Sequence, residues 1–391
     1  MSVIIKSSLF KAKSFYSKFG DFTLLTRYAS TTKKPLAQNI PEEEIKKSVF
    51  ISQSTDIYTN LALEDWFYRN YDFSKHHILL LWKNDPCVVI GRHQNPWLEC
   101  NVAGCEQKNI LIARRNSGGG TVYHDPGNLN LSFFTPRERY NRKYNLEIIT
   151  RALFRQWGLK AIINKKEDII VQNEFKISGT AAKLGRPNAY HHCTLLVDAK
   201  KQDLSLALKK TETGITTNAT QSVRSPVKNL SEVNSHIKID HLLNAVGWEY
   251  LRTKAVTLQD GGHKLVEDQK GFQMINPTED WFPGIDQLTE EFRSWDWTFG
   301  RSPKFTVTRV LEASVPDGGR HIIKLVVEVD KGIVQDVKMT LPMDDNQNAS
   351  VMTNLLGKRY SHELTDSIVE ATGCKVVAYD VKDDQSDVAA I

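Results

Sequence analysis

Residues 114–128 read Arg114-Arg115-Asn116-Ser117-Gly118-Gly119-Gly120-Thr121-Val122-Tyr123-His124-Asp125-Pro126-Gly127-Asn128, the most specific stretch of this 391-residue chain. Three consecutive glycines let the backbone pass close to a ligand and present bare N–H groups. An arginine can bind a carboxylate or phosphate through two parallel hydrogen bonds. A glycine triplet alone is more typical of a flexible turn. This triplet lies between an arginine pair and a turn-forming Asp-Pro-Gly-Asn, so we predict a ligand-binding loop that runs into a strand.

The pattern around this loop predicts strands and helices in irregular alternation. The helix expected at 146–157 should end at Gly158, because glycine is the residue most often found just after the end of a helix. Irregular alternation favours a mixed sheet with helices packed on it over a strict βαβ repeat. The expected strands are 77–82, 87–91, 109–113, 129–134, a short one near 162, 169–171 and 194–197, and the expected helices are 57–68, 146–157 and a short one from 204 to 208.

The character of the chain changes near residue 263. Apolar and polar residues alternate over 305–311, 321–329 and 333–341, with Pro-Asp-Gly-Gly and Asp-Lys-Gly turns between them. This pattern predicts an antiparallel three-stranded meander. A helix is expected over 351–371, broken near Gly357 and stopped at Gly373. The fold class is therefore α/β (α+β), with a second, small α+β domain.

The first 28 residues resemble a mitochondrial presequence. They carry five basic residues and one acidic residue, Asp21, with apolar and aromatic residues between the lysines. This composition is typical of an amphipathic transit peptide, and Arg27-Tyr28-Ala29-Ser30 suggests cleavage after Tyr28. A basic tail without structure is the alternative. The predicted location is the mitochondrial matrix.

The predicted organisation has five parts. They are a transit peptide at 1–28, a Pro-punctuated linker at 29–46, a large domain at 47–262 that contains the candidate binding loop, a connector at 263–283 and a small C-terminal accessory domain at 284–391.

Composition restricts the function further. Beyond residue 28 the chain has 46 basic and 45 acidic residues, so it lacks the basic excess of a typical nucleic-acid-binding domain. Five cysteines without a C-x-x-C pair indicate neither a disulfide framework nor a zinc site. No apolar run is long enough to span a membrane. We therefore expect no nucleic-acid, membrane or structural-metal partner.

A second segment carries candidate chemistry. It reads Lys176-Ile177-Ser178-Gly179-Thr180-Ala181-Ala182-Lys183, and His191-His192-Cys193-Thr194-Leu195-Leu196 follows. Taken alone, Lys176 is most simply an exposed lysine. The tandem histidines could suggest a metal site, but adjacent residues of a strand point to opposite faces of the sheet. Joint ligation is not expected, and no metal ligand is predicted.

Together the two segments resemble the lipoate–protein ligase A and lipoyltransferase family. That family carries R-x-S-G-G-G-x-V-[FY]-H-D-x-G-N and, later in the chain, K-[IV]-S-G-x-A and H-H-G-T-L-L. The resemblance extends to 80–101, 222–230 and the Trp295–Gly300 box, and covers most of residues 50–300. It implies a large mixed-sheet catalytic domain of the biotin/lipoate protein ligase type.

The resemblance also implies an activity. Family members pass a lipoyl group from lipoyl-AMP, or from a lipoylated H protein, to a lysine ε-amine. The implied acceptors are the apo-lipoyl domains of 2-oxoacid dehydrogenase E2 subunits and the glycine cleavage H protein. The nucleotide could bring Mg²⁺ with it. A monomer is expected.

Site residues follow from the same motifs. Lys176 is implied as the catalytic lysine beside the acyl carbonyl and the phosphate. The implied lipoyl-adenylate site consists of Arg115, Ser117, Gly118, Gly119, Gly120, Val122, Tyr123, His124, Asp168, Ser178, Gly179, Lys183, His192 and Thr194. Lys166, Thr217, Ala219 and Thr220 are further candidates for which structural packing is an equal explanation.

Three departures from the family pattern affect the predicted activity. Cys193 replaces the usual glycine, Lys183 stands where bacterial ligases often have arginine, and Thr217-Asn218-Ala219-Thr220 lengthens the loop before Ser222. Lys183 and the longer loop leave open whether the chain can activate free lipoate with ATP. The stretch 211–214 has no cysteine, which argues against a thioester intermediate. A complete ligase, a non-catalytic lipoyl-domain adapter and a nucleic-acid-binding module stay open as alternatives.

Overall fold

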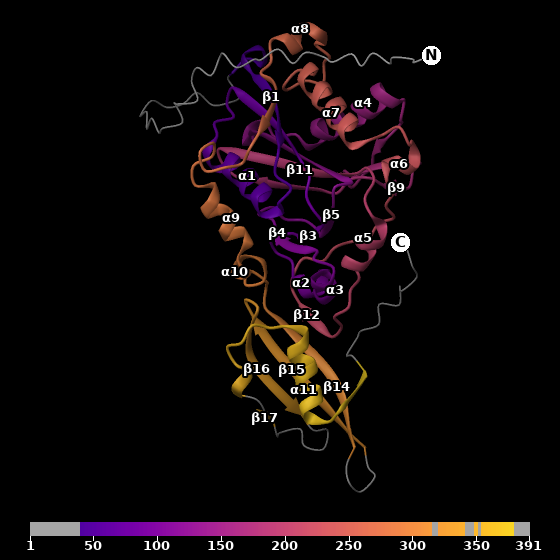
Figure 1. Cartoon of the computed structure of the whole chain (residues 1–391), viewed down its shortest axis with the longest axis vertical. Helices are drawn as coiled ribbons and strands as arrows, with labels where there is room; N and C mark the ends of the chain where they lie inside the picture. Colours follow the sequence, from indigo (N-terminus) through magenta and orange to yellow (C-terminus); the bar gives the residue numbers. More distant parts are fainter. Residues whose placement is uncertain (1–39, 315–319, 341–347, 351–352, 379–391) are drawn as a thin grey trace, which may run out of the picture. The chain divides into compact units, whose positions relative to one another are not determined.

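The computed structural model describes residues 40–314, 320–340, 348–350 and 353–378 (Figure 1). The predicted transit peptide, 1–28, and residues 29–39 of the predicted linker lie outside this part of the chain. Within it, no helix combines the length and the apolar composition needed to cross a membrane.

A six-stranded mixed sheet forms the centre of the protein. Its strand order is β10-β11-β6-β2-β1-β13, and the pairs β2–β1 and β1–β13 are parallel while the others are antiparallel. The mixed sheet predicted from the sequence is confirmed. The strands are β1 (Lys46–Ser52), β2 (His76–Trp82), β6 (Asn128–Pro136), β10 (Thr180–Leu184), β11 (Asn188–Leu196) and β13 (Gly271–Ile275).

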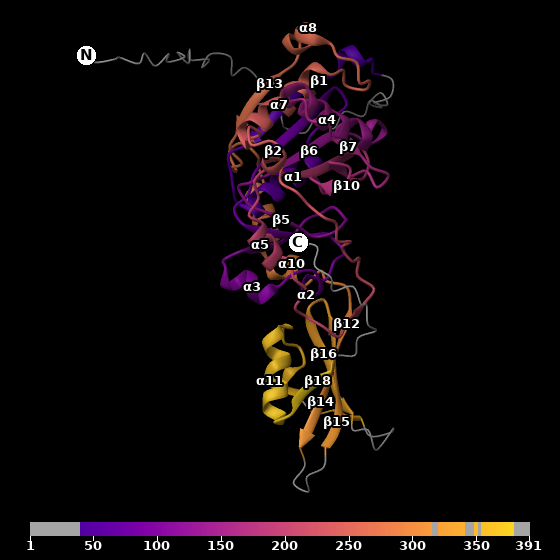
Figure 2. The same cartoon turned by 90° about the vertical axis from the view of Figure 1, so that its right-hand side faces the viewer.

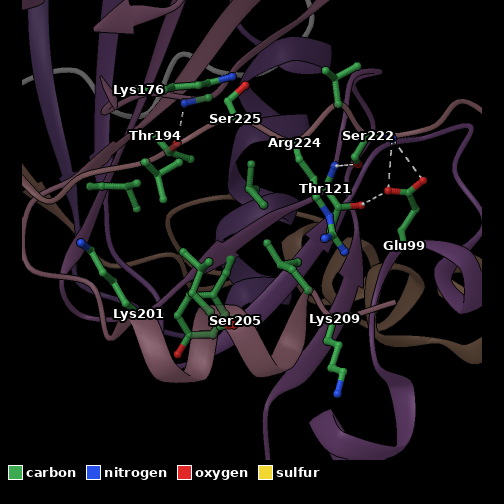
Figure 3. A pocket seen from close by; sticks show the side chains of 18 of the residues that line it. Glu99, Thr121, Lys176, Thr194, Lys201, Ser205, Lys209, Ser222, Arg224 and Ser225 are labelled. Carbon is green, nitrogen blue, oxygen red and sulfur yellow. Dashed lines mark hydrogen bonds between the residues drawn. The ribbon is translucent and has the colours of Figure 1, made fainter. Parts of the chain in front are cut away.

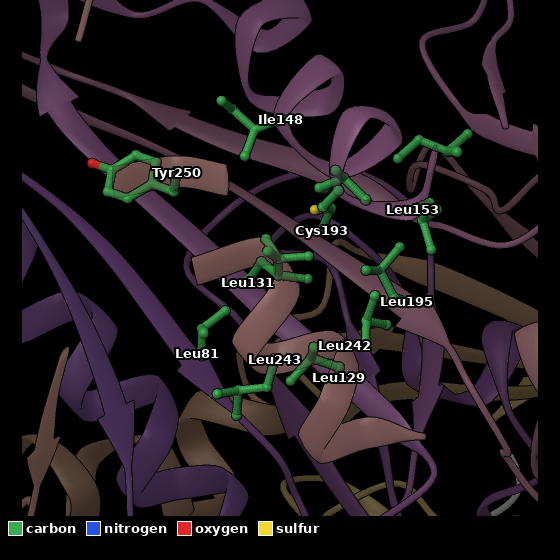
Figure 4. Packing of buried hydrophobic residues seen from close by; sticks show 14 of the residues in the cluster. Leu81, Leu129, Leu131, Ile148, Leu153, Cys193, Leu195, Leu242, Leu243 and Tyr250 are labelled. Atoms are coloured by element: carbon green, nitrogen blue, oxygen red, sulfur yellow. The ribbon is translucent and has the colours of Figure 1, made fainter. Parts of the chain in front are cut away.

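Helices cover both faces of this sheet. Leu79 and Leu81 of β2 pack with α4 (Arg142–Trp157) and α7 (Ile239–Arg252) on one face, where Figure 4 shows Leu81 among neighbouring core side chains. Ile78 and Leu80 pack with α1 (Ile57–Asn70) and α9 (Ile285–Arg293) on the other. A strand buried on both faces needs a continuous apolar run rather than alternation, which explains the sequence of β2.

Two three-stranded sheets lie beside the large one and carry the predicted motifs. The first has the order β4-β3-β5, with β3 at Cys87–Ile90, β4 at Leu111–Arg114 and β5 at Val122–His124. The glycine loop connects its two outer strands. The second has the order β7-β8-β9, with β7 at Ile162–Ile163, β8 at Ile169–Val171 and β9 at Phe175–Lys176.

The C-terminal sheet contains the three strands of the predicted meander and, within the described residues, three further strands. The antiparallel strands β14 (Phe305–Ser314), β15 (Arg320–Asp330) and β16 (Ile333–Thr340) confirm it. The sheet also includes β12 (Ile215–Thr217), β17 (Asn348–Ser350) and β18 (Lys375–Ala378). Figure 2 shows α11 (His362–Thr372) alongside this sheet. Ile368 of α11 is buried in its core.

The remaining helices are short. They are α2 (Pro96–Glu99), α3 (Val102–Gln107), α5 (Lys201–Ala207), α6 (Leu230–Val233), α8 (Gly262–Glu267) and α10 (Trp295–Thr298), with 3-10 turns at Glu42–Glu44, Arg137–Arg139 and Thr353–Leu355.

Element boundaries differ most from the predicted ones at the starts of β11 and of the last helix. β11 begins at Asn188, before the expected 194, because this buried segment continues the pairing with β6. The last helix begins at His362 rather than 351, since Ser361 caps it there and Gly357 has a φ of +77°. Gly158 and Gly373 end their helices in the left-handed conformation, as predicted.

Strand pairing crosses the predicted domain limits. β13 lies in the predicted connector, yet it pairs with β1 in the large sheet. β12 lies in the predicted catalytic domain, yet it pairs with β14 in the C-terminal sheet. The limits 47–262, 263–283 and 284–391 stay predictions.

Candidate active site

Lys176 lies at the end of the short strand β9, and its backbone is held on two sides. Its N–H donates to the carbonyl of Pro226 (2.9 Å), and its carbonyl accepts from the N–H of Lys228 (3.2 Å). Its Nζ is 2.8 Å from Oδ1 of Asp168, and about a quarter of the side chain is exposed. The backbone contacts fix the position of the Lys176 main chain, while its ammonium group stays accessible.

Three cavities meet at Lys176. The lysine-rimmed cavity, of about 290 Å³, is lined by Val122, Tyr123, Ser178, Leu204 and Lys209 among others. The histidine cavity, of about 340 Å³, is lined by Leu61, Trp82, Val89, His124 and His192 among others. The outer cavity, of about 350 Å³, is lined by Lys165, Lys166, Asp168, Glu174 and Ser225 among others. Lys176 belongs to the lining of all three.

The lysine-rimmed cavity combines apolar walls with basic groups at its rim. Figure 3 shows Glu99, Thr121 and Ser222 together on one side of it and Lys176 on the other. The Thr121 N–H donates to Ser222 Oγ (2.8 Å), and the Ser222 N–H donates to Glu99 Oε1 (3.2 Å). Lys201, Lys209, Lys210 and Arg224 supply the positive charge. An elongated ligand with an anionic group suits this lining.

The histidine cavity has aliphatic and aromatic walls with two buried imidazoles. Burial lowers the pKa of His124 to about 3, so this ring is neutral at pH 7. His192 Nδ1 is 2.9 Å from Glu64 Oε1, and its Nε2 is 2.8 Å from Ser117 Oγ. A largely apolar chain with few hydrogen-bonding groups suits this cavity.

Arg115 shapes the glycine loop from inside. Its guanidinium is fully buried and donates to the Gly118 and Gly120 carbonyls (both 2.6 Å), to Val89 O (3.0 Å) and to Ser117 Oγ (3.0 Å). These bonds occupy the donors that a two-pronged contact with a phosphate would need. The side chain borders the histidine cavity, but its direct contact with a ligand stays a prediction.

The neighbouring Arg114 connects this sheet to the Trp295–Gly300 box. Its Nε donates to the Trp297 and Thr298 carbonyls (3.1 and 3.0 Å), and Trp297 Nε1 donates back to the Arg114 carbonyl (2.7 Å). The side chain is fully buried. The two motifs therefore share one hydrogen-bonded junction in the fold.

The structure brings most of the predicted site residues to these cavities. Ser117 and Gly118 do not line them but hold the loop through Arg115. Lining residues from the prediction are Arg115, Gly119, Gly120, Val122, Tyr123, His124, Lys166, Asp168, Lys176, Ser178, Gly179, His192, Thr194 and Thr220.

Lys183, Thr217 and Ala219 are absent from these linings. Lys183 Nζ binds Asp65 Oδ1 at 3.0 Å and lies over the ring of Tyr68. Thr217 belongs to β12 and donates to the carbonyl of Lys304 (3.0 Å). These neighbours give each of the two a structural partner, and any ligand contact stays a prediction.

Some lining residues were not predicted. Glu99 and Thr121 lie within the stretches 80–101 and 114–128 that carry the family resemblance, whereas Lys201 and Lys209 lie outside every motif. Ser222 and Arg224 belong to a segment that takes part in the family resemblance, so its motif offered a usable signal. Among the described residues, no group of three or more His, Cys, Asp or Glu side chains could hold a metal ion.

Comparisons with known proteins agree with this geometry. The model of the lipoyl protein ligase A/B catalytic domain matches residues 56–249. The chain is 45% identical to the mitochondrial lipoyl amidotransferase of Mus musculus over 74% of this chain and 75% of that protein. Identity to the mitochondrial lipoyl amidotransferase of Homo sapiens is 41%, over 78% of this chain and 80% of that protein.

Solved structures show the same fold. P. falciparum LipL1 in complex with lipoate superposes with a TM-score of 0.54 at 25% identity, covering 75% of this chain and 84% of that one. Lipoate-protein ligase A bound with ATP superposes with a TM-score of 0.50 at 22% identity, covering 65% and 98%. The motifs, the fold and the relatives agree: the chain belongs to the lipoyl protein ligase A/B family.

Proposed function

We propose that this protein transfers a lipoyl group from lipoyl-AMP to the ε-amine of a lysine on apo-lipoyl domains. The observation that carries the proposal is the position of Lys176 at the junction of the three cavities. The lysine-rimmed cavity would take the nucleotide and the histidine cavity the acyl chain. The acyl–phosphate bond of the donor would then lie beside the Lys176 ammonium.

The reaction forms one bond and breaks another. The acceptor amine attacks the acyl carbonyl carbon, the C–N bond forms, the C–O bond to the phosphate breaks, and the amine loses a proton. AMP leaves with an additional negative charge. A fixed ammonium stabilises that charge as it develops. The outer cavity would let the acceptor lysine reach the carbonyl from the side opposite the nucleotide.

Asp168 orients the Lys176 ammonium in this scheme. Their 2.8 Å contact lies where the outer cavity reaches the junction. A Mg²⁺ that accompanies the nucleotide would have to share this carboxylate with Lys176. We therefore assign Asp168 to the lysine.

We propose the acceptors on the family resemblance of the sequence. The acceptors would be lipoyl domains of 2-oxoacid dehydrogenase E2 subunits and the glycine cleavage H protein. The proposed location is the mitochondrial matrix, which rests on the presequence-like first 28 residues and on the word mitochondrial in the names of the mouse and human relatives. A monomeric state stays a prediction.

The test uses the full chain with an apo-lipoyl domain and three separate donors: lipoyl adenylate, lipoate with ATP and Mg²⁺, and lipoylated H protein. The intact mass of the acceptor is measured over time. Transfer from the first or third donor only indicates a pure transferase, and transfer from all three indicates a complete ligase. No mass gain from any donor would overturn the proposal in favour of an adapter.

Lys176→Ala is expected to lower the transfer rate by about 10²–10³, the usual cost of removing a group that stabilises developing charge. Lys176→Arg should restore little, because the planar guanidinium reaches the phosphate differently. Lys264→Ala, at an exposed lysine of α8, is the control and should retain the full rate. An unchanged rate in Lys176→Ala would refute the catalytic assignment.

A further inference from the structure

One continuous segment, residues 211–228, connects the C-terminal sheet to all three cavities; we call it the strap. Near the site it lines the cavities with Thr220, Ser222, Val223, Arg224 and Ser225, among others. Through these contacts the strap forms a wall of the site.

The strap also supports the two motifs directly. Ser222 Oγ accepts from the N–H of Thr121, next to the glycines. Gln94 Nε2 donates to Ser222 Oγ (3.0 Å), and Gln94 Oε1 accepts from the N–H of Gly91 (2.8 Å). Pro226 O accepts from the N–H of Lys176. A shift of the strap would therefore move both the glycine loop and the lysine backbone.

The beginning of the strap belongs to a different sheet. β12 pairs antiparallel with β14, with Ile215 opposite Val307. Gly214 O accepts from the N–H of Thr308 (2.9 Å). Gly214 has a φ of +66°, and a Cβ there would lie 2.3 Å from the Thr308 carbonyl oxygen. Only glycine fits this conformation and this close approach.

A buried ion pair fastens this beginning. Arg309 of β14 and Glu212 of the strap each have side chains 4% exposed, and their N–O distance is 2.9 Å. The Arg309 guanidinium also donates to the Thr213 carbonyl. The second carboxylate oxygen of Glu212 contacts Nδ1 of His362 at the start of α11. Separating the pair would leave a buried carboxylate without its partner, which strongly destabilises the fold. The ion pair therefore holds the strap to the sheet.

We propose that Arg309 is a positioning residue for the donor site: through Glu212 and Thr213 it sets the strap, and the strap sets the walls of the cavities and the backbone of Lys176. The C-terminal sheet is then part of the catalytic apparatus rather than an appended module. This inference rests on the proposed function for the identity of the donor, lipoyl adenylate, but not for the mechanical link itself.

The mechanical link is tested by hydrogen–deuterium exchange on the full chain. Arg309→Ala should speed amide exchange over 213–225 while exchange in β2 and β6 stays as in the wild type. Lys338→Ala, which removes an exposed ion pair with Asp336 on the same sheet, is the matched control and should leave 213–225 unchanged. Unchanged exchange over 213–225 in Arg309→Ala would overturn the proposal.

The functional consequence is tested with lipoyl adenylate. Arg309→Ala should weaken its binding, measured by calorimetry, and raise its KM by about tenfold or more, while kcat falls less, since the lost interaction positions the binding walls. A merely structural role would lower the active fraction and leave KM unchanged, which would also overturn the proposal. A wild type that binds no adenylate would refute the proposed function, while the exchange result would still decide the link.

Two further variants cover the case in which Arg309→Ala does not fold. Arg309→Lys keeps the charge opposite Glu212 but loses the second donor to Thr213. Gly214→Ala disturbs the same anchor, because its Cβ would crowd the Thr308 carbonyl and the Arg309 guanidinium, while both members of the ion pair are kept. Both should raise KM in the same direction as Arg309→Ala. Wild-type KM in both folded variants would contradict a positioning role for the anchor.

Discussion

The Glu64 carboxylate is the buried charge that organises the histidine cavity. It is 2% exposed, and its Oε1 accepts from Ser132 Oγ (2.6 Å) and lies 2.9 Å from His192 Nδ1. Burial by itself would raise the pKa of Glu64, but the charge of His192 and the hydrogen bonds lower it overall. Glu64 therefore stays ionised, and it orients His192 toward Ser117.

Glu64→Gln is expected to lower kcat/KM for the donor by roughly tenfold or more, since a hydrogen bond to a charged group contributes about 1.5–3 kcal/mol. The amide lacks the charge of the carboxylate that faces His192 Nδ1, so His192, Ser117 and the loop are held less firmly. Steady-state transfer at several donor concentrations measures the effect. Glu106→Gln, at an exposed carboxylate of α3, is the control. Equal kcat/KM in both variants would count against this role.

At the scale of elements, the end of β3 and the glycine loop are packed backbone against backbone. A Cβ on Gly91 would lie 2.1 Å from the Gly119 carbonyl oxygen, whereas a Cβ on Gly118 would meet no atom within 4 Å. The steric reason for glycine at position 91 therefore does not apply at position 118. Gly91 is needed by the fold, whereas a side chain at Gly118, which does not line the three cavities, would point into open space.

Gly91→Ala should lower both the melting temperature and donor binding, because the loop must shift to admit the methyl group. Gly118→Ala should change the free energy of unfolding by less than about 0.5 kcal/mol, yet weaken donor binding if the ligand approaches this backbone. Thermal unfolding and calorimetric titration of both variants separate the two effects. Wild-type donor affinity in Gly118→Ala would place the ligand away from this residue.

For the whole molecule, buried neutral histidines make stability depend on pH. Burial lowers the pKa of His77, and likewise of His124, to about 3, whereas an unfolded histidine has a pKa of about 6.5. The unfolded chain therefore binds more protons between these values. The stability that these residues contribute is fully present above pH 6.5 and is lost as the pH falls toward 3.

Each such histidine should cost about 2 kcal/mol of stability between pH 7 and pH 5. His77→Gln removes one of these titrations and lies outside the three cavities, so the free energy of unfolding of this variant should fall less between pH 7 and pH 5 than that of the wild type. Chemical denaturation at a series of pH values measures the slope. His236→Gln, at an exposed histidine, should keep the wild-type slope, and a wild-type slope in His77→Gln as well would contradict the assignment.

Local patterns were enough to predict many elements and the candidate site. The apolar run of β2, the αL glycines Gly158 and Gly373, and the alternating strands of the meander each depend on neighbours along the chain. Burial on one or two faces and turn geometry leave a direct trace in such patterns. The glycine loop and Lys176 were found because their motifs carry the family resemblance.

Tertiary structure decided what each motif residue touches. Arg115 was expected to face a ligand, but its donors are directed at the carbonyls of its own loop. β12 and β13 were not predicted, and each pairs with a strand distant in the chain. Glu64 and Arg309 have no local pattern because their partners, His192 and Glu212, are more than 90 residues away. Periodicity indicates which face of an element is buried, but it does not indicate which charged groups face each other, and only the tertiary structure places Asp168 against Lys176.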